Sequence, residues 1–360
     1  MTSRGRLGVF TSTTKEAPVS EAYDGKQIVG MDLHRRRSVL VRMTDTGEHL
    51  ETVRISNDPE YLRAVMARAG EAPEVVLEAA YGWYWAADVL AELGARVHLA
   101  HPLGVKMFSY RRVKNDERDA ADLADLLRMG RLPEAWIAPP VTRELRELVR
   151  HRAKLVALRS SLKCQVHAVL AACGVVVSMS DLFGAGGQAL LERVELAPAF
   201  RARVNSARRV IEVLDFEIEL FTNLAGGRLR GHPGYTAIQA ISGVGPILAA
   251  VFVAEIGEVG RFARAAQLAS WAGLTPKHHE SDTTVHRGRI TKQGCRLVRW
   301  AAVEAIQRTD RHSRLGRVRD QVGARRGTSI GKVAAARELI ELIFYGLRDG
   351  HIRCLTHRSA

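Results

Sequence analysis

The sequence predicts an α/β domain followed by a long all-α remainder, and three observations indicate this. Residues 27–102 alternate short β-branched runs with amphipathic segments, a pattern typical of a partly parallel sheet with helices. From Val141 onward, apolar residues recur at helical spacing over long stretches. The charge also changes: residues 1–140 hold 19 Lys and Arg against 20 acids, whereas residues 227–360 hold 22 against 10.

The elements of the α/β part follow in order from local signals. β-branched runs broken by Asp45-Thr46-Gly47 predict a strand, a hairpin turn and a second strand. Glycines at 70 and 94 predict the ends of two helices. The expected elements are a flexible leader at 1–25, the hairpin at 27–55, a helix at 59–70, a strand at 73–80, a helix at 81–94 and a strand at 95–102.

The remainder is expected to be helical. Residues 142–174 form one long helical pattern, and a second helical region near 188–225 ends at Ala225-Gly226-Gly227. These two helices fit either a coiled coil with a partner or a plain bundle within one domain. The last third opens with a helical stretch at 237–257 and closes with a helix at 330–350, whereas residues 271–294 are expected to be irregular, polar and basic. The predicted divisions are 1–25, 26–140, 141–226 and 227–360.

The composition indicates which kind of partner the protein binds and in which compartment it acts. A formal net charge of +14 and a pI of about 10.1 favour a polyanionic partner, usually nucleic acid. The four cysteines form no metal-binding pair or disulfide pattern. Because the start lacks an apolar signal region and no apolar run is long enough to span a bilayer, we expect a cytoplasmic protein without a membrane partner.

The stretch KNDERDAADLADLL, residues 114–127, places five acids in fourteen residues of this basic chain. On a helix, Asp116 is in line with the apolar stripe formed by Ala120, Leu123 and Leu127, and Asp119 lies 60° away. An inward carboxylate is costly unless a positive group meets it. The alternative is a capped helix start, where the helix dipole favours acids.

Two further acids change the interpretation of that helix. Asp32 lies within the strand-like run IVGMDL, and Glu78 ends the strand-like run VVLE. Either could be an ordinary salt-bridged acid. Carboxylates from neighbouring strands and one helix can also converge, and converging carboxylates need cations. Asp32, Glu78, Asp116 and Asp119 therefore predict a site for Mg²⁺, with Mn²⁺ as a possible substitute, and a pair of such ions suits phosphodiester cleavage.

The basic third offers sites for nucleic acid. ISGVGPIL, residues 241–248, is similar to a helix-hairpin-helix turn, in which Gly243 and Gly245 permit a tight turn before Pro246. An ordinary turn between helices is the alternative. RGRITKQG, residues 287–294, suits phosphate contacts or is a solvated basic loop. The candidate nucleic-acid-binding residues are Gly243, Gly245, Lys277, Arg287, Arg289, Lys292 and Arg296. His278, His279 and His286 lack a clear metal-ligand spacing.

These motifs, in this order over most of residues 27–350, resemble the DEDD-type insertion-sequence transposases, the IS110 family of site-specific recombinases. The resemblance is carried by GMDLHRR, LEAAYGWY and KNDERDAADLADLL in the first third. ISGVGPILAAVFVAEIG, RFARAAQLASWAGLTPKHHESDTT, RGRITKQGCRLVRWAAVEA and IGKVAAARELIELI carry it in the last third.

The resemblance implies an N-terminal RNase H or RuvC-like domain whose acids map to Asp32, Glu78, Asp116 and Asp119. It also implies a coiled-coil linker and a C-terminal transposase domain with a nucleophilic serine, which maps to Ser281. The family commonly has Ser-Gly where this chain has Ser281-Asp282, so Thr283 and Ser270 are the alternatives. The serine would form a covalent phosphoserine link to double-stranded DNA.

The resemblance further implies an assembly. The serine of one protomer would meet the acids of another in a homo-dimer or tetramer, and an element-encoded guide RNA would select the DNA. Two other functions stay open from the residues alone. A Holliday-junction-resolvase-like Mg²⁺ nuclease needs the four acids but no serine. A non-catalytic nucleic-acid-binding scaffold would tolerate replacement of all four acids.

Overall fold

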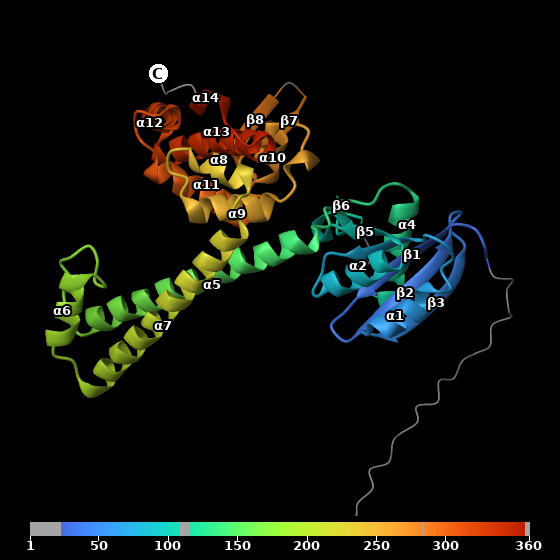
Figure 1. Cartoon of the computed structure of the whole chain (residues 1–360), viewed down its shortest axis with the longest axis horizontal. Helices are drawn as coiled ribbons and strands as arrows, with labels where there is room; N and C mark the ends of the chain where they lie inside the picture. Colours follow the sequence, from blue (N-terminus) through green and yellow to red (C-terminus); the bar gives the residue numbers. More distant parts are fainter. Residues whose placement is uncertain (1–22, 109–114, 283, 357–360) are drawn as a thin grey trace, which may run out of the picture. The chain divides into compact units, whose positions relative to one another are not determined.

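The computed structural model describes residues 23–108, 115–282 and 284–356, so most of the predicted leader, residues 1–22, lies outside the described residues. The chain divides into two compact units, Met1–Ile137 and Ala138–Ala360 (Figure 1). Each unit is described by itself.

The first unit contains a six-stranded sheet in the order β3-β2-β1-β4-β5-β6. The strands are β1 (Gln27–Leu33), β2 (Arg37–Thr44), β3 (His49–Ser56), β4 (Glu74–Glu78), β5 (Arg96–Ala100) and β6 (Glu134–Ala135). β1, β4 and β5 are parallel to one another, whereas β2, β3 and β6 each pair antiparallel with a neighbour. The α/β class with a partly parallel sheet is therefore confirmed.

The prediction of two strands over residues 27–55 was wrong, because the structure has three. The predicted turn at residues 45–47 joins β2 to β3, and an additional turn at residues 34–36 joins β1 to β2. That turn consists of His34, Arg35 and Arg36 and lacks the glycine, proline or asparagine that usually marks a turn. It closes where the backbone N–H of His34 donates to the carbonyl of Arg37 at 3.2 Å.

Helices cover both faces of this sheet (Figure 1). The helices of the unit are α1 (Pro59–Met66), α2 (Trp83–Glu92), α3 (Pro102–Val105) and α4 (Asp116–Arg128). Met31 and Leu77 point into the core shared with α1 and α2. Ile28 packs with α4, and so does Val76, both on the opposite face. Because side chains alternate along a strand, Asp32 and Glu78 belong to the α4 face.

The second unit begins with a long helical hairpin. α5 (Pro140–Ala172) packs along α7 (Pro198–Arg228), and α6 (Ala185–Arg193) lies between them in sequence. The single helical region expected near 188–225 was wrong in two ways. It is two helices, since Pro198 favours a new helix start. Gly226 and Gly227 lie inside α7 and do not end it.

The remaining helices, apart from the short α14, form one apolar core with parts of α5 and α7. They are α8 (Pro233–Gln239), α9 (Pro246–Ile256), η1 (Val259–Arg261), α10 (Ala265–Trp271), α11 (Arg296–Arg308), α12 (Arg314–Arg326), α13 (Thr328–Asp349) and α14 (Arg353–Thr356). Residues 248–256 of α9 are all buried, as expected of a helix that is apolar all round. Val149 of α5 and Ala225 of α7 belong to this core.

Residues 271–294 are not irregular, so that expectation was wrong. They contain a two-stranded hairpin, β7 (Pro276–Ser281) and β8 (Thr284–Ile290). Its base is fixed by close backbone packing, because a Cβ on Gly294 would lie 1.7 Å from the carbonyl oxygen of Trp271. The strands are polar and exposed, so they lack the apolar alternation that would have predicted them. None of the helices in the described parts of the chain is sufficiently long and apolar to span a bilayer.

Candidate active site

Two of the predicted acids lie at matching ends of neighbouring strands. Met31 of β1 pairs with Leu77 of the parallel strand β4. Asp32 and Glu78 are the next residues of these two strands, so they lie side by side on the face that α4 covers. The parallel register thus brings together two carboxylates that are 46 positions apart in the sequence.

α4 supplies the other two acids from its first turn. The helix begins at Asp116, and the side chain of Asn115 accepts a hydrogen bond from the N–H of Glu117 at 3.1 Å. The capped helix start that the sequence left open is therefore present. This cap is compatible with the predicted metal site. Asp116 and Asp119 are partly buried and Ala120 behind them is fully buried, so the two carboxylates lie against the protein and not in open solvent.

Gly30 determines how closely α4 approaches the sheet. A Cβ at this position would lie 1.8 Å from the carbonyl oxygen of Ala120 and 3.1 Å from the Cβ of Ala124. The backbones of β1 and α4 can touch only because residue 30 has no side chain. Gly30 is two residues before Asp32, so the contact holds the start of α4 next to the strand acids.

Gly30→Ala is expected to destabilise the first unit by about 1–3 kcal/mol, as overpacking of a core does. It should also weaken divalent-metal binding, because α4 must move away from β1. Thermal melting and calorimetric Mn²⁺ binding would measure both effects. Gly82→Ala is a matched control for added bulk, because no atom lies within 4 Å of a Cβ there, although its φ of +76° adds strain of its own. Unchanged metal affinity in Gly30→Ala would contradict this account.

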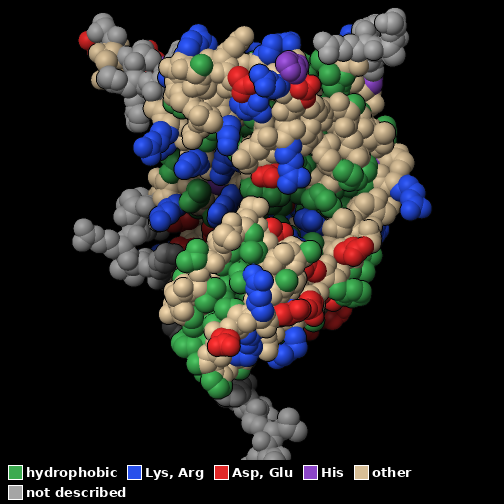
Figure 2. Space-filling model, turned by 90° about the vertical axis from the view of Figure 1, so that its left-hand side faces the viewer, with side chains coloured by type: hydrophobic (Ala, Val, Ile, Leu, Met, Phe, Trp, Pro, Cys, Tyr) green, Lys and Arg blue, Asp and Glu red, His purple; other side chains and the backbone are tan. Residues whose placement is uncertain are grey.

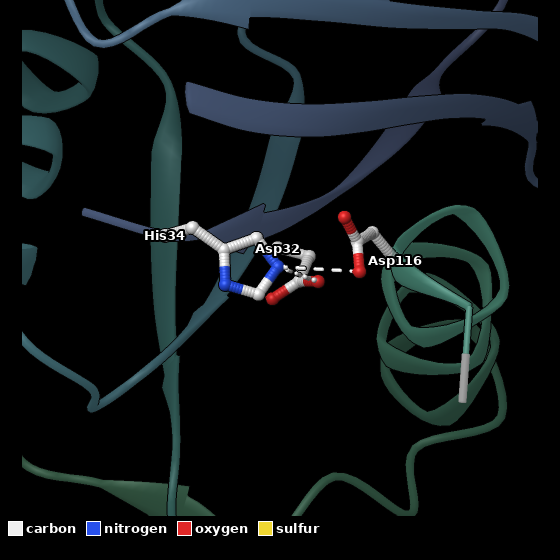
Figure 3. Close-up of side chains that lie close together, drawn as sticks. All are labelled: Asp32, His34 and Asp116. Atoms are coloured by element: carbon white, nitrogen blue, oxygen red, sulfur yellow. Dashed lines mark ion pairs between the residues drawn. The ribbon is translucent and has the colours of Figure 1, made fainter. Parts of the chain in front are cut away.

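Figure 3 shows that a histidine also points into the acid cluster. The Nε2 atom of His34 lies 3.1 Å from Oδ2 of Asp32 and 3.4 Å from Oδ1 of Asp116. Arg37, three residues later, places a guanidinium nitrogen 3.9 Å from Oδ2 of Asp116. Sequence reasoning missed His34. Its position two residues after Asp32 was the available indication, because such residues share a face of a strand.

Asp32 is the acid with the most perturbed environment. Its side chain is 15% exposed, against 37% for Asp116. Burial raises the pKa of Asp32, His34 lowers it, and the charges of Asp119, Asp116 and Glu78 raise it again. The four predicted acids are thus close enough for three of them to act on the charge of the fourth.

These residues fit a hard divalent cation. Donor atoms of Asp32, His34 and Asp116 all lie within 4.8 Å of one another, and this is the only such cluster in the parts of the chain that the structure describes. Carboxylate oxygens are the usual ligands of Mg²⁺. A cation there would also relieve the repulsion that raises the pKa of Asp32.

Ser281 lies in the other unit, at the end of β7. It pairs with Thr284 across the hairpin, and its side chain is exposed. Asp282 follows with φ of +51°, the left-handed region that favours glycine. Aspartate tolerates this region better than most residues, which fits Asp282 at this position. Of the alternative nucleophiles, Ser270 is exposed on α10, and Thr283 lies outside the described residues.

The other predicted nucleic-acid contacts also lie in the second unit. Lys277, Arg289, Lys292 and Arg296 are exposed, whereas the side chain of Arg287 lies outside what the structure describes. Gly243 has φ of +89°, and a Cβ there would lie 2.2 Å from the carbonyl oxygen of Ala305. Gly245 is the exposed N-cap of α9 and has no side-chain cap.

A groove of about 660 Å³ opens beside this glycine turn. Arg152 and Arg159 of α5 line one part of it, and Trp300 and Arg308 of α11 line another. The Nε atom of Arg152 donates to the hydroxyl of Thr222, a neutral acceptor, at 2.7 Å. Burial and the charge of Arg159 lower the pKa of Arg152. The groove thus combines guanidinium groups with a half-exposed indole.

Comparison with protein families shows that the chain is a transposase. Residues 29–174 match the model of the DEDD transposases of IS110, described as "Transposase", and residues 235–321 match the model described as "Transposase IS116/IS110/IS902 family". The two matches together cover more than half of the chain. The chain belongs to the IS116/IS110/IS902 family of transposases.

Individual relatives agree with this assignment. A probable family 20 transposase of Pseudomonas aeruginosa is 29% identical over 59% of this chain, and the match spans 63% of that protein's own length. The transposase for insertion sequence element IS1111A of Coxiella burnetii is 23% identical over 79% of this chain and 78% of its own. A 44.8 kDa protein of insertion element IS116 from Streptomyces clavuligerus is 25% identical over 89% of this chain and 94% of its own.

Proposed function

We propose that this chain cuts and rejoins DNA strands to move an insertion sequence, acting in the cytoplasm through a covalent bond between Ser281 and DNA. The observation that carries the proposal is the β1–β4 register, which sets Asp32 beside Glu78 under the start of α4. We also assign the first unit to the RNase H or RuvC-like type. Its mixed sheet and the match to the DEDD transposase model support this assignment.

Asp32, Glu78, Asp116 and Asp119 would hold the divalent cation, for which Mg²⁺ is the first candidate. When bound, such an ion supplies Lewis acidity at the scissile phosphate. The carboxylates fix its place next to the turn at residues 34–36. Arg35 and Arg36 of that turn are exposed and suit contacts to a DNA phosphate beside the acids.

Ser281 would be the nucleophile. Its Oγ atom forms a bond to phosphorus while the bond from phosphorus to one deoxyribose oxygen breaks, and that oxygen takes up the proton. The number of phosphodiester bonds is conserved, so a second DNA end can reverse the step and rejoin strands. The exposed position of Ser281 at a hairpin tip supports this role, because the tip can reach a DNA backbone.

The second unit would provide most of the DNA contacts. Lys and Arg side chains gather on the upper part of the face drawn in Figure 2. The arginine-lined groove beside Gly243 and Gly245 can take a phosphate, and Trp300 can stack on an unpaired base. The first-turn N–H groups of α9 next to Gly245 add further donors.

Arg308→Ala is expected to weaken binding to all nucleic acids alike and to reduce the slope of log affinity against log salt by about 1. Trp300→Ala should weaken binding of single strands by about 1–3 kcal/mol, since base stacking is worth that much. Fluorescence anisotropy at several salt concentrations measures both. Arg348→Ala is the control, because Arg348 is not among the residues that line the groove, and it is ion-paired with Asp349 just as Arg308 is ion-paired with Glu304. Equal losses in the control would show that total charge, and not the groove, determines binding.

A second apolar stripe on α7 supports the proposed homo-oligomer. Residues of α7 that face α5 are buried, whereas others about half a turn away are exposed. The exposed ones are Val213, Phe216, Leu220 and Leu224. Their spacing of three and four residues is typical of a helix that packs on another helix. We propose that a second copy covers this stripe, and that an element-encoded RNA selects the DNA.

The decisive experiment is covalent trapping. Purified protein, Mg²⁺, labelled DNA of the element junction and target, and RNA from the flanking non-coding DNA of the element are mixed and then denatured. We expect a protein–DNA adduct in the wild type and none in Ser281→Ala. Ser160→Ala is a matched control, because Ser160 is an exposed serine of the same unit whose hydroxyl donates to the carbonyl of Val156 within α5.

Three other outcomes of the trapping experiment would each support a different interpretation. An adduct in Ser281→Ala would move the nucleophile to Thr283 or Ser270. Free cut ends without an adduct would favour the resolvase-like nuclease, in which water attacks. Binding that survives replacement of all four acids, without any cutting, would favour the non-catalytic scaffold.

A further inference from the structure

We infer that His34 is a direct nitrogen ligand of the divalent metal, so the site has a mixed set of imidazole and carboxylate donors and prefers Mn²⁺ to Mg²⁺. This inference rests on the proposed metal site at Asp32 and Asp116. It adds a ligand of a different chemical kind to the four acids. The preference follows because imidazole nitrogen suits transition metals better than it suits Mg²⁺.

The distances around His34 carry the inference. Its Nε2 atom lies 3.1 Å from Oδ2 of Asp32 and 3.4 Å from Oδ1 of Asp116 (Figure 3). An octahedral ion with ligands at about 2.1 Å separates adjacent donors by about 3 Å. The Nε2 atom of His34 therefore already lies, from each aspartate oxygen, close to the spacing of neighbouring ligands of one ion.

The backbone explains why this side chain is available. His34 is the first residue of the turn after β1, and the side chain of Asn57 donates to its carbonyl oxygen at 2.6 Å. Its N–H donates to the carbonyl of Arg37. The backbone is thus held at both polar groups, whereas the imidazole is 47% exposed and can adjust to an entering ion.

A direct polar contact between His34 and the two aspartates, with no ion between them, is the competing explanation. It produces the same contacts without metal, so metal-free structures do not separate the two. The difference is whether nitrogen remains bound once a cation occupies the site, which a spectroscopic measurement on the metal itself detects.

The test uses Mn²⁺ alone with the full-length protein and electron spin echo envelope modulation. We expect modulation from a directly coordinated ¹⁴N nucleus in the wild type, replaced by the ¹⁵N pattern when histidine is ¹⁵N-labelled. His34→Gln should lose it, and its Mn²⁺ affinity should fall at least about tenfold. His49→Gln, an exposed histidine on β3, should keep both.

The outcomes separate this inference from the proposed function. Mn²⁺ binding that requires Asp32 but shows no nitrogen modulation in the wild type would overturn the role of His34 and leave the metal site intact. Mn²⁺ binding that is insensitive to Asp32→Asn would overturn the metal site itself, and with it the inference. The wild-type spectrum is decisive even if His34→Gln fails to fold.

Discussion

Asp32→Asn is expected to abolish strand cleavage and at the same time to raise the melting temperature of the metal-free protein. Loss of a ligand from the metal site should lower activity at least about 1,000-fold, since metal catalysis supplies several kcal/mol. The gain in stability has a separate cause, which is the largely buried charge that the wild type carries among three other acids.

The pH dependence of that gain follows from the direction of the pKa shift. The folded protein binds the proton of Asp32 more tightly than the unfolded chain, for which the ordinary pKa is 3.8. Asp32 therefore contributes its full stabilisation of the fold below its unfolded pKa of 3.8. That contribution is lost as the pH rises through the higher pKa of Asp32 in the folded protein. Above the raised folded pKa the ionised Asp32 is a net cost, which an uncharged asparagine of the same shape removes.

Calorimetry without divalent metal, repeated with Mn²⁺, measures this effect. The variant should melt a few degrees higher than the wild type without metal, since about 1 kcal/mol corresponds to roughly 2–8 °C for domains of about 60–250 residues. Added Mn²⁺ should stabilise only the wild type. Asp122→Asn, exposed on the same helix, is the control. A lower melting temperature for metal-free Asp32→Asn would contradict the proposed electrostatic strain.

Glu255→Gln is expected to destabilise the second unit by about 3 kcal/mol. The carboxylate is 3% exposed and lies in the last turn of α9, where the helix dipole disfavours a negative charge. Arg150 of α5 compensates with two hydrogen bonds of 2.7 and 2.8 Å. Arg146 donates to the carbonyl oxygens of Ala254 and Glu255, each at 2.9 Å.

The size of this destabilisation depends on how far solvent reaches the ion pair between Glu255 and Arg150. Removing one partner of a buried ion pair costs about 3–5 kcal/mol, but Arg150 is 42% exposed, so the lower end applies. Urea unfolding measures the change, and Glu258→Gln is the exposed control two residues beyond α9. The sulfhydryl of Cys295 also donates to Glu255 at 3.4 Å. A change below about 0.5 kcal/mol would mean that Arg150 does not hold α5 against α9.

The metal site shows how far sequence reasoning extends. The four acids could be selected from the sequence because carboxylates inside apolar strands and in line with an apolar helical stripe are costly without a cation. His34 and Gly30 could not be selected in this way. His34 precedes three arginines, and that run has no metal-ligand pattern of its own. A glycine in a strand gives no indication of which helix crosses it until the helix is in place.

The second unit shows the same limit in its secondary structure. Long helices were predictable because apolar residues recur at a period of 3.6 over many turns. The β7–β8 hairpin was not, because its strands lack the apolar alternation that usually predicts a strand. The groove beside Gly243 combines residues of α5, α9 and α11, which are far apart in the sequence.

The sequence by itself determined the α/β and helical classes and the family, and it predicted which acids form the site, because these depend on local periodicity and on ordered motifs. Only the tertiary structure decided that Asp32 and Glu78 lie side by side, that Gly30 admits α4, and that His34 reaches two carboxylates. These features depend on strand register and on the approach of one backbone to another. Both are set by contacts between residues distant in the chain, which no local pattern encodes.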